Sequence, residues 1–179
     1  MFITVKTITK LNLGHGDKFA INVSRSPDMS KAFDSLCPPL LIKKLESYHF
    51  SDHALNLVRS YFSQRKNRVR LASATSQWRD VVRGCPQGST FGPLLWNVFQ
   101  NDLTQATVEA DISMYADDHQ IFSSDHSIGR VEEKLIHDGS KITKWYEENL
   151  LQVNIKKYQS MVLGERNGTV EMNMQIGGV

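Results

Sequence analysis

Two adjacent carboxylates, Asp117 and Asp118, are the residues of this chain whose type and spacing are best suited to chemistry. They lie between two partly apolar segments, 112–116 and 119–122. This order predicts a tight β-hairpin with the aspartates at its turn. Neighbouring side chains at a turn can approach one ion, and the mutual repulsion of two carboxylates favours a hard divalent cation such as Mg²⁺. Aspartate is also a common turn former, so a solvated turn is the alternative for the pair taken alone.

A third carboxylate, Asp28, stands far upstream of this pair. It follows a segment with strand character, 19–23, and precedes a helical stretch. If the strands before Asp28 and Asp117 lie side by side, three carboxylates meet at one edge of a sheet. Such an arrangement suits two-metal phosphoryl transfer, in which one ion activates a 3′-hydroxyl and the other stabilises the leaving pyrophosphate.

Helices and strands that would position these carboxylates are indicated by periodicity and by capping residues. Proline suits the first turn of a helix, and serine is a good N-cap. Helices are predicted to begin at Pro38–Pro39, after Ser51, at Gly92–Pro93 and at about Ser127, the last ending at Asn149. Strands are predicted at 3–5, 19–23, 112–116, 119–122, 150–155, 160–163 and 172–179, with a turn at 14–17.

The predicted helices carry apolar residues at helical spacing, which indicates the faces that pack into a core. These residues are Leu41, Leu45, Leu55, Val58, Phe62, Leu94, Leu95, Val98, Phe99, Leu103, Val131, Leu135, Ile142 and Trp145.

The segment 59–70 contains five basic residues and no acidic residue, with aromatic side chains interleaved. It could follow a phosphate backbone, although charge alone fits a solvated loop equally well. Alternating apolar and basic residues predict a strand with one polar face, and 78–82 is its expected hairpin partner. The basic residues are Arg59, Arg65, Lys66, Arg68 and Arg70.

The length of 179 residues fits one domain or slightly more. The expected location is intracellular, in the cytoplasm or the nucleus. The net charge of +2 is small, so affinity for nucleic acid must come from local basic patches. Two cysteines, Cys37 and Cys85, offer no framework of disulfides and indicate reduced thiols. No apolar run is long enough to cross a membrane, and the first ten residues lack the apolar centre of a signal peptide.

Four blocks of the chain, taken in order, resemble the motifs of the reverse transcriptase of non-LTR (LINE-type) retrotransposons. Each block alone is weak, but four in the family's order argue against chance. The blocks are Asp28-Met29-Ser30-Lys31-Ala32-Phe33-Asp34; Gly84-Cys85-Pro86-Gln87-Gly88-Ser89 continuing through Gly92–Leu95 to Asn101–Leu103; Tyr115-Ala116-Asp117-Asp118; and Asn149–Asn154 with Lys157–Gly164.

The resemblance implies an α+β fold, the polymerase palm, with a small antiparallel sheet and helices packed on one face. It implies an RNA-directed DNA polymerase that uses two Mg²⁺ ions, with Mn²⁺ as the alternative ion. The implied partners are an RNA template, a DNA primer and deoxynucleoside triphosphates. The match predicts a palm-like domain over 28–179 with incomplete fingers and no thumb, after a poorly matched segment, 1–27.

The resemblance also implies which residues hold the metal. Asp28 and Asp117 would be the main ligands, and Asp118 a more peripheral one. Asp34 belongs to the same first block, but we interpret it as structural, as a cap for the following helix.

Four further residues are implied to bind the nucleotide. Phe33 would lie under the incoming sugar and exclude a 2′-hydroxyl. Gln87 and Gly88 would contact the template and the nucleotide pocket. Lys157 would lie near the pyrophosphate, where a cation helps the leaving group to depart.

Two alternatives remain at the level of sequence. One is a catalytically inactive retroelement remnant, favoured by Pro27, which stands where the family has apolar strand residues, and by the missing thumb. The other is a nucleic-acid-binding module that uses the basic segment 59–70. In the family that the chain resembles, the thumb holds the primer end in line with the triphosphate. We therefore expect these 179 residues alone not to extend a primer appreciably.

Overall fold

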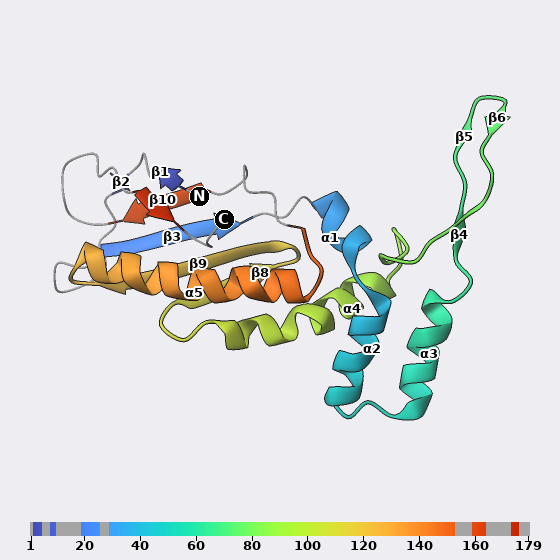
Figure 1. Ribbon diagram of the computed structural model, residues 1–179, viewed down its shortest axis with the longest axis horizontal. Helices are drawn as coiled ribbons and strands as arrows, with labels where there is room; N and C mark the ends of the chain where they lie inside the picture. The colour runs from blue at the N-terminus through green and yellow to red at the C-terminus, as the bar shows by residue number, and fades with distance from the viewer. Residues whose placement is uncertain are drawn as a thin grey trace. The chain divides into compact units, whose positions relative to one another are not determined.

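The computed structural model describes residues 2–4, 8–9, 19–25, 29–152, 159–163 and 173–175. The chain forms two compact units, one made of 1–29 with 101–179 and the other of 30–100 (Figure 1). No helix among the described residues combines the length and the hydrophobicity needed to cross a bilayer. The predicted turn at 14–17, Asp28 and Lys157 lie outside the described residues, as do 153–155 of the predicted strand 150–155; its described part, 150–152, is not a strand.

A five-stranded sheet forms the centre of the first unit. Its neighbouring strands run antiparallel except at one edge, where β2 and β10 are parallel. A separate antiparallel pair joins β1 (Phe2–Thr4) to β11 (Asn173–Gln175). In spatial order the five strands are β2 (Ile8–Thr9), β10 (Gln159–Leu163), β3 (Phe19–Arg25), β9 (Asp118–Asp125) and β8 (Asp111–Tyr115).

Helix α5 (Ile128–Glu148) runs along β9 and β3 and covers one face of this sheet (Figure 1). Side chains of β9 alternate between buried and exposed, with Ile121 buried and Phe122 exposed, as expected for a strand with one covered face. The predicted stripe on the helix and its end at Asn149 are confirmed. The α+β fold with a helix on one face of a mainly antiparallel sheet is therefore confirmed. The buried apolar residues of α5 are Val131, Leu135, Ile142, Trp145 and Tyr146.

Two polar side chains attach α5 to the segment that leads into β8. The indole Nε1 of Trp145 donates to Oδ1 of Asp102 at 3.0 Å, in the 3₁₀ helix η1 (Asn101–Ala106). The fully buried Asp138 accepts, at its Oδ2, three backbone hydrogen bonds of 2.7–2.9 Å. These contacts hold the segment that leads into β8 against α5. The three donors are the N–H groups of Val108, Glu109 and Ala110.

The second unit contains four helices and a long hairpin. Its buried apolar residues come from all four helices, from the link between the first two helices and from the loop before the last helix. The helices are α1 (Met29–Ser35), α2 (Pro38–Ser47), α3 (Asp52–Phe62) and α4 (Phe91–Gln100). The buried apolar side chains are Ala32, Leu36, Leu41, Leu45, Leu55, Val58, Cys85, Leu95, Trp96 and Phe99.

Most of the local sequence signals in this unit are confirmed. Helix α2 begins at Pro38, and the side chain of Ser51 caps α3 by accepting from the N–H of Ala54 at 3.4 Å. The predicted cap role of Asp34 is wrong, because Asp34 lies within α1 and Cys37 occupies the N-cap position of α2. Leu94 is exposed, since it lies on the outer side of α4.

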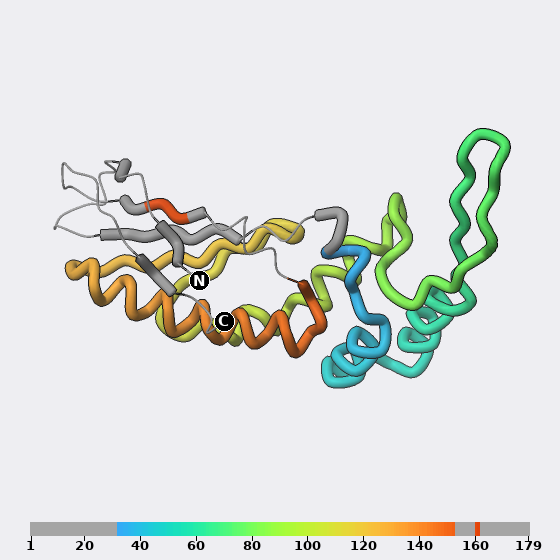
Figure 2. The backbone as a smooth tube through the Cα atoms, turned by 45° about the horizontal axis from the view of Figure 1, so that its top comes forward, coloured from blue at the N-terminus to red at the C-terminus, as the bar shows by residue number. Residues whose placement is uncertain are grey.

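Residues 64–83, which we name the basic hairpin, follow α3 and project from it (Figures 1 and 2). Its strands are β4 (Lys66–Asn67), β5 (Arg70–Leu71), β6 (Ala74–Thr75) and β7 (Arg79–Asp80), with β4 paired to β7 and β5 to β6. The predicted hairpin with 78–82 is confirmed by the β4–β7 pair, but the apolar side opposite the predicted polar face is not buried: Val69 and Leu71 are 72% and 78% exposed. The reason is that the hairpin consists of two antiparallel chain segments over which no other described element packs, so alternation buries neither face.

Candidate active site

The predicted hairpin around the two aspartates is confirmed. Tyr115 pairs with Asp118 across β8 and β9, so Ala116 and Asp117 form a two-residue turn. Ala116 has φ 54, in the left-handed region. That conformation costs an L-residue about 1–2 kcal/mol and is found where the surrounding structure fixes it, often at functional sites.

Both carboxylates at this turn are shielded from solvent to different degrees. Asp117 is 0% exposed, and Asp118 is half-buried. No described residue donates a hydrogen bond to Oδ1 of Asp118, although this atom is inaccessible to water. A buried oxygen without a donor is costly, and oxygen ligands of this kind are those that Mg²⁺ prefers. The turn therefore fits a divalent cation.

The strand before Asp28 is brought to the same end of the sheet. Strand β3 pairs with β9, and its last residue, Arg25, lies opposite His119, the neighbour of Asp118. The prediction that a strand precedes Asp28 and a helix follows it is confirmed, since α1 begins at Met29. The described residues contain no group of three metal-ligating side chains. The place of Asp28 at the turn stays a prediction.

A buried contact not foreseen from sequence holds the start of β9. His119, which is 2% exposed, shares a hydrogen bond through Nδ1 with the hydroxyl of Tyr146 on α5. The two rings also stack, with centroids 5.7 Å apart. Because His119 follows Asp118 directly, the contact fixes the turn against the helix. The signal available in the sequence was a histidine on the covered face of a strand, where a polar group needs a partner.

In the second unit, the loop 84–89 is attached to helix α1. The N–H of Cys85 donates to the carbonyl of Phe33 at 2.9 Å, and the N–H of Gly84 donates to the carbonyl of Leu36 at 2.8 Å. The ring of Phe33 packs on Trp96 of α4, with centroids 5.4 Å apart. The structure therefore connects the first and second sequence blocks through their backbones.

Gly84 is the closest point of this attachment. It has φ +79, and a Cβ built on it would lie 2.7 Å from Cα of Asp34. We predict that Gly84→Ala lowers the free energy of unfolding by about 2–4 kcal/mol, because backbone strain and a steric clash add together.

Gly88→Ala is the matched control for this prediction. Gly88 also has a positive φ, +77, but nothing lies within 4 Å of its added Cβ. The free energy of unfolding of Gly88→Ala should fall only by the cost of the backbone conformation, about 1 kcal/mol. Urea denaturation of both variants measures the difference, and equal losses would show that the approach to Asp34 is not tight.

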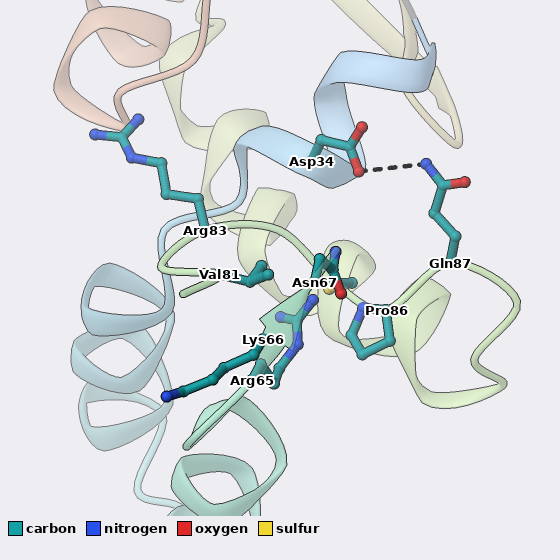
Figure 3. A pocket seen from close by; sticks show the side chains of 9 residues that line it. Asp34, Arg65, Lys66, Asn67, Val81, Arg83, Pro86 and Gln87 are labelled. Atoms are coloured by element: carbon teal, nitrogen blue, oxygen red, sulfur yellow. Dashed lines mark hydrogen bonds between the residues drawn. The ribbon is translucent and has the colours of Figure 1, made fainter. Parts of the chain in front are cut away.

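A pocket of about 720 Å³ lies between the base of the basic hairpin and the loop before α4 (Figure 3). Gln87 donates from Nε2 to Oδ1 of Asp34 at 3.3 Å across one side of it. Burial raises the pKa of the Cys85 thiol to about 11, opposed by the guanidinium of Arg65. Three cations against one carboxylate make the lining suitable for an anion. The lining residues are Asp34, Arg65, Lys66, Asn67, Val81, Arg83, Cys85, Pro86 and Gln87.

The predicted basic residues divide between two places. Arg59 lies on α3 and forms an exposed ion pair with Glu46 at 2.7 Å. The other four belong to the basic hairpin: Arg65 donates to the carbonyl of Gly84, and Lys66 lies 3.6 Å from Asp80. Arg68 and Arg70 are exposed on it. Arg83, which lines the pocket together with Arg65 and Lys66, was not singled out from the sequence.

Comparison with known proteins identifies the family to which the chain is similar. Residues 22–174 match the family model described as "Reverse transcriptase (RNA-dependent DNA polymerase)". The chain is 28% identical over 149 residues to the RNA-directed DNA polymerase from mobile element jockey of Drosophila melanogaster, covering 79% of this chain and 16% of that protein. It is 38% identical over 109 residues to the Pol polyprotein of the type-1 retrotransposable element R1 of Bradysia coprophila, covering 59% of this chain and 10% of that protein.

Among solved structures, the fold is similar to that of apo telomerase from Candida tropicalis, truncated from its C-terminal domain. The TM-score is 0.62 at 10% sequence identity, over 88% of this chain and 34% of the telomerase chain. This likeness concerns the fold alone. The chain thus spans 10%, 16% and 34% of the R1, jockey and telomerase proteins, respectively.

Proposed function

Because the chain belongs to the reverse transcriptase (RNA-dependent DNA polymerase) family, we propose that it carries the palm of a retrotransposon polymerase. In this proposal it adds deoxynucleotides to a DNA primer and uses an RNA strand as the template, inside the cell, in the cytoplasm or the nucleus. The observation that carries the proposal is the buried Asp117, beside Asp118, at a strained two-residue turn next to the end of β3. Residues 28–179 would form the palm-like part.

Asp28, Asp117 and Asp118 would hold the divalent ions, Mg²⁺ or Mn²⁺. When bound, these ions supply activation of the primer hydroxyl and stabilisation of charge on the leaving pyrophosphate. The protein's own contribution is to keep the carboxylates in place. His119 does this through its hydrogen bond to Tyr146, and the Asp138 contacts hold the segment before β8.

Nucleotide binding is proposed for Phe33, Gln87, Gly88 and Lys157. Gln87 and Gly88 are exposed on the loop before α4, where a ligand can approach the backbone. The cationic pocket below this loop suits a phosphate group, since Arg and Lys donate charge-assisted hydrogen bonds to phosphate oxygens.

We predict that Phe33→Val raises ribonucleotide incorporation relative to deoxyribonucleotide incorporation by about 10- to 100-fold, as removal of a steric block to one hydroxyl would. The ratio of kcat/KM values for the two substrates is the measurement. Phe99→Leu is the matched control, because Phe99 stacks on the same Trp96 at 5.9 Å but is fully buried. An equal change of the ratio in both variants would mean that Phe33 is only part of the core.

Primer extension tests the proposed function. The chain is fused within the flanking regions of the jockey polymerase, of which it covers 16%, and is supplied with an RNA template, a DNA primer, deoxynucleotides and Mg²⁺. Extension that depends on the template and the ion is expected. Absence of extension by a folded fusion, with RNA binding retained, would instead support the binding-module function, which the exposed basic hairpin favours.

A further inference from the structure

The basic hairpin concentrates positive charge. Residues 64–83 contain six basic residues and one acidic residue, Asp80, whereas the whole chain has a net charge of only +2. The cations lie on both strands and at both ends of the ribbon. A ribbon of this kind attracts a polyanion along its length. The basic residues are Arg65, Lys66, Arg68, Arg70, Arg79 and Arg83.

The same hairpin exposes large apolar side chains between its cations. Trp78 is 57% exposed, and Val69, Leu71 and Val82 are each more than 70% exposed. The guanidinium of Arg68 lies 4.5 Å from the centroid of the Trp78 ring. An indole with a guanidinium over it offers flat surfaces on which another planar group can stack.

The backbone of the hairpin holds these two residues in place. The N–H of Ser76 donates to the carbonyl of Val69, and the N–H of Val69 donates to Oγ of Ser76, both at 2.9 Å. These bonds lie between the β4–β7 pair and the β5–β6 pair. Arg68 and Trp78 therefore lie on a ribbon that is bonded on both sides of them.

We propose that Trp78 and Arg68 form a stacking platform for a base of a single-stranded nucleic acid, whose phosphates contact the neighbouring cations. Unpaired bases expose the π-faces that a platform of this type needs, whereas bases in a duplex are stacked on one another. A second copy of this chain is disfavoured as the occupant, because two such hairpins repel each other. The identification of the strand as the unpaired RNA template rests on the proposed function.

The first test measures tryptophan fluorescence during titration with a short single-stranded RNA. Of the three tryptophans, Trp96 and Trp145 are 1% and 7% exposed, so Trp78 is the one that a ligand can reach. Quenching is expected with single-stranded RNA, and much less with the same sequence as a duplex. Equal quenching by the duplex would contradict the platform.

The second test measures affinity by the anisotropy of labelled RNA, which does not depend on tryptophan emission. Trp78→Ala should weaken binding by about 5- to 100-fold, the range expected for loss of one stacked base. Trp78→Phe should retain most of the affinity, and Val82→Ala, which removes exposed apolar surface from the same hairpin, should change it less than about twofold.

Affinity that is unchanged in Trp78→Ala would overturn the proposal. So would a wild-type self-association, seen by sedimentation, that Trp78→Ala abolishes while RNA binding persists, since the patch would then bind a second copy. Neither test needs catalysis. A fusion that extends no primer but still loses RNA affinity in Trp78→Ala would support the platform while contradicting the proposed polymerase activity.

Discussion

Asp117→Asn is expected to reduce primer extension by at least about 10³-fold, because removal of one group that stabilises transition-state charge already costs 10²–10³. Asparagine keeps the shape of the side chain but removes the charge that a divalent ion requires. Asp117 is fully buried, so water cannot easily replace the lost ligand. The measurement is single-turnover extension by the fusion with the jockey flanking regions, with Mg²⁺ and with Mn²⁺.

Asp125→Asn is the matched control for this variant. Asp125 ends the same strand, β9, but forms an ion pair with Lys134 at 3.0 Å, away from the turn. Its extension rate should stay within a few-fold of the unmodified fusion. A near-normal rate for Asp117→Asn would show that the carboxylate of Asp117 takes no part in the reaction.

Asp138→Ala is expected to lower the free energy of unfolding by about 3–5 kcal/mol, because one buried and two partly buried N–H donors lose their acceptor, at a cost of about 1–3 kcal/mol for each donor that water cannot reach. The donors belong to the segment that leads into β8. Urea denaturation followed by circular dichroism is the measurement. Glu133→Ala, which removes an exposed carboxylate from the same helix, should change stability by less than about 0.5 kcal/mol. Similar losses in the two variants would contradict the anchoring role.

The contribution of Asp138 should also depend on pH. Burial alone raises the pKa of Asp138, but the hydrogen bonds from Ala110, Glu109 and Val108 outweigh it and hold the pKa below the ordinary value of 3.8. A folded-state pKa that is depressed adds stability above the unfolded value, and that stability is lost as pH falls through the folded pKa. The stability difference between the wild type and Asp138→Ala should therefore be full at neutral pH and shrink below about pH 4.

The elements with local signals were predictable from sequence. The periodicity of α5 identified its buried residues and its end at Asn149, and the alternation around Asp117 identified the hairpin. Ser51 and Pro38 marked helix starts because a cap and a proline act within one turn. Each of these signals depends only on residues a few positions apart.

The contacts that assemble the site were not predictable in this way. The pairing of β3 with β9 and the bond between His119 and Tyr146 join distant parts of the chain. Nothing near Asp138 in sequence indicates that its donors lie about 30 residues earlier. The alternation in the basic hairpin predicted a strand with one polar face, but burial of the opposite face depends on a covering layer that the sequence does not specify.

The sequence predicted the candidate metal ligands better than the residues that hold those ligands in place. Asp117 and Asp118 were identified from adjacency and context, and the hairpin is as predicted, although its two-residue turn is Ala116–Asp117 and Asp118 begins β9. Trp78 and Arg83 were not predicted as binding residues, because a single aromatic or basic residue carries little information until the fold shows its neighbours. These neighbours are Arg68 for Trp78 and the pocket residues for Arg83.

The central claim is that Asp28, Asp117 and Asp118 converge on one divalent-ion site. Fe²⁺ substituted for Mg²⁺, with hydrogen peroxide and ascorbate added, tests it most directly, since bound Fe²⁺ reduces the peroxide to hydroxyl radicals that cut the backbone close to the ion. Cuts at 117–118 and also around residue 28 are predicted, with both sets suppressed by excess Mg²⁺ and absent in Asp117→Asn. Cuts at the turn with none around residue 28 would contradict the three-carboxylate site.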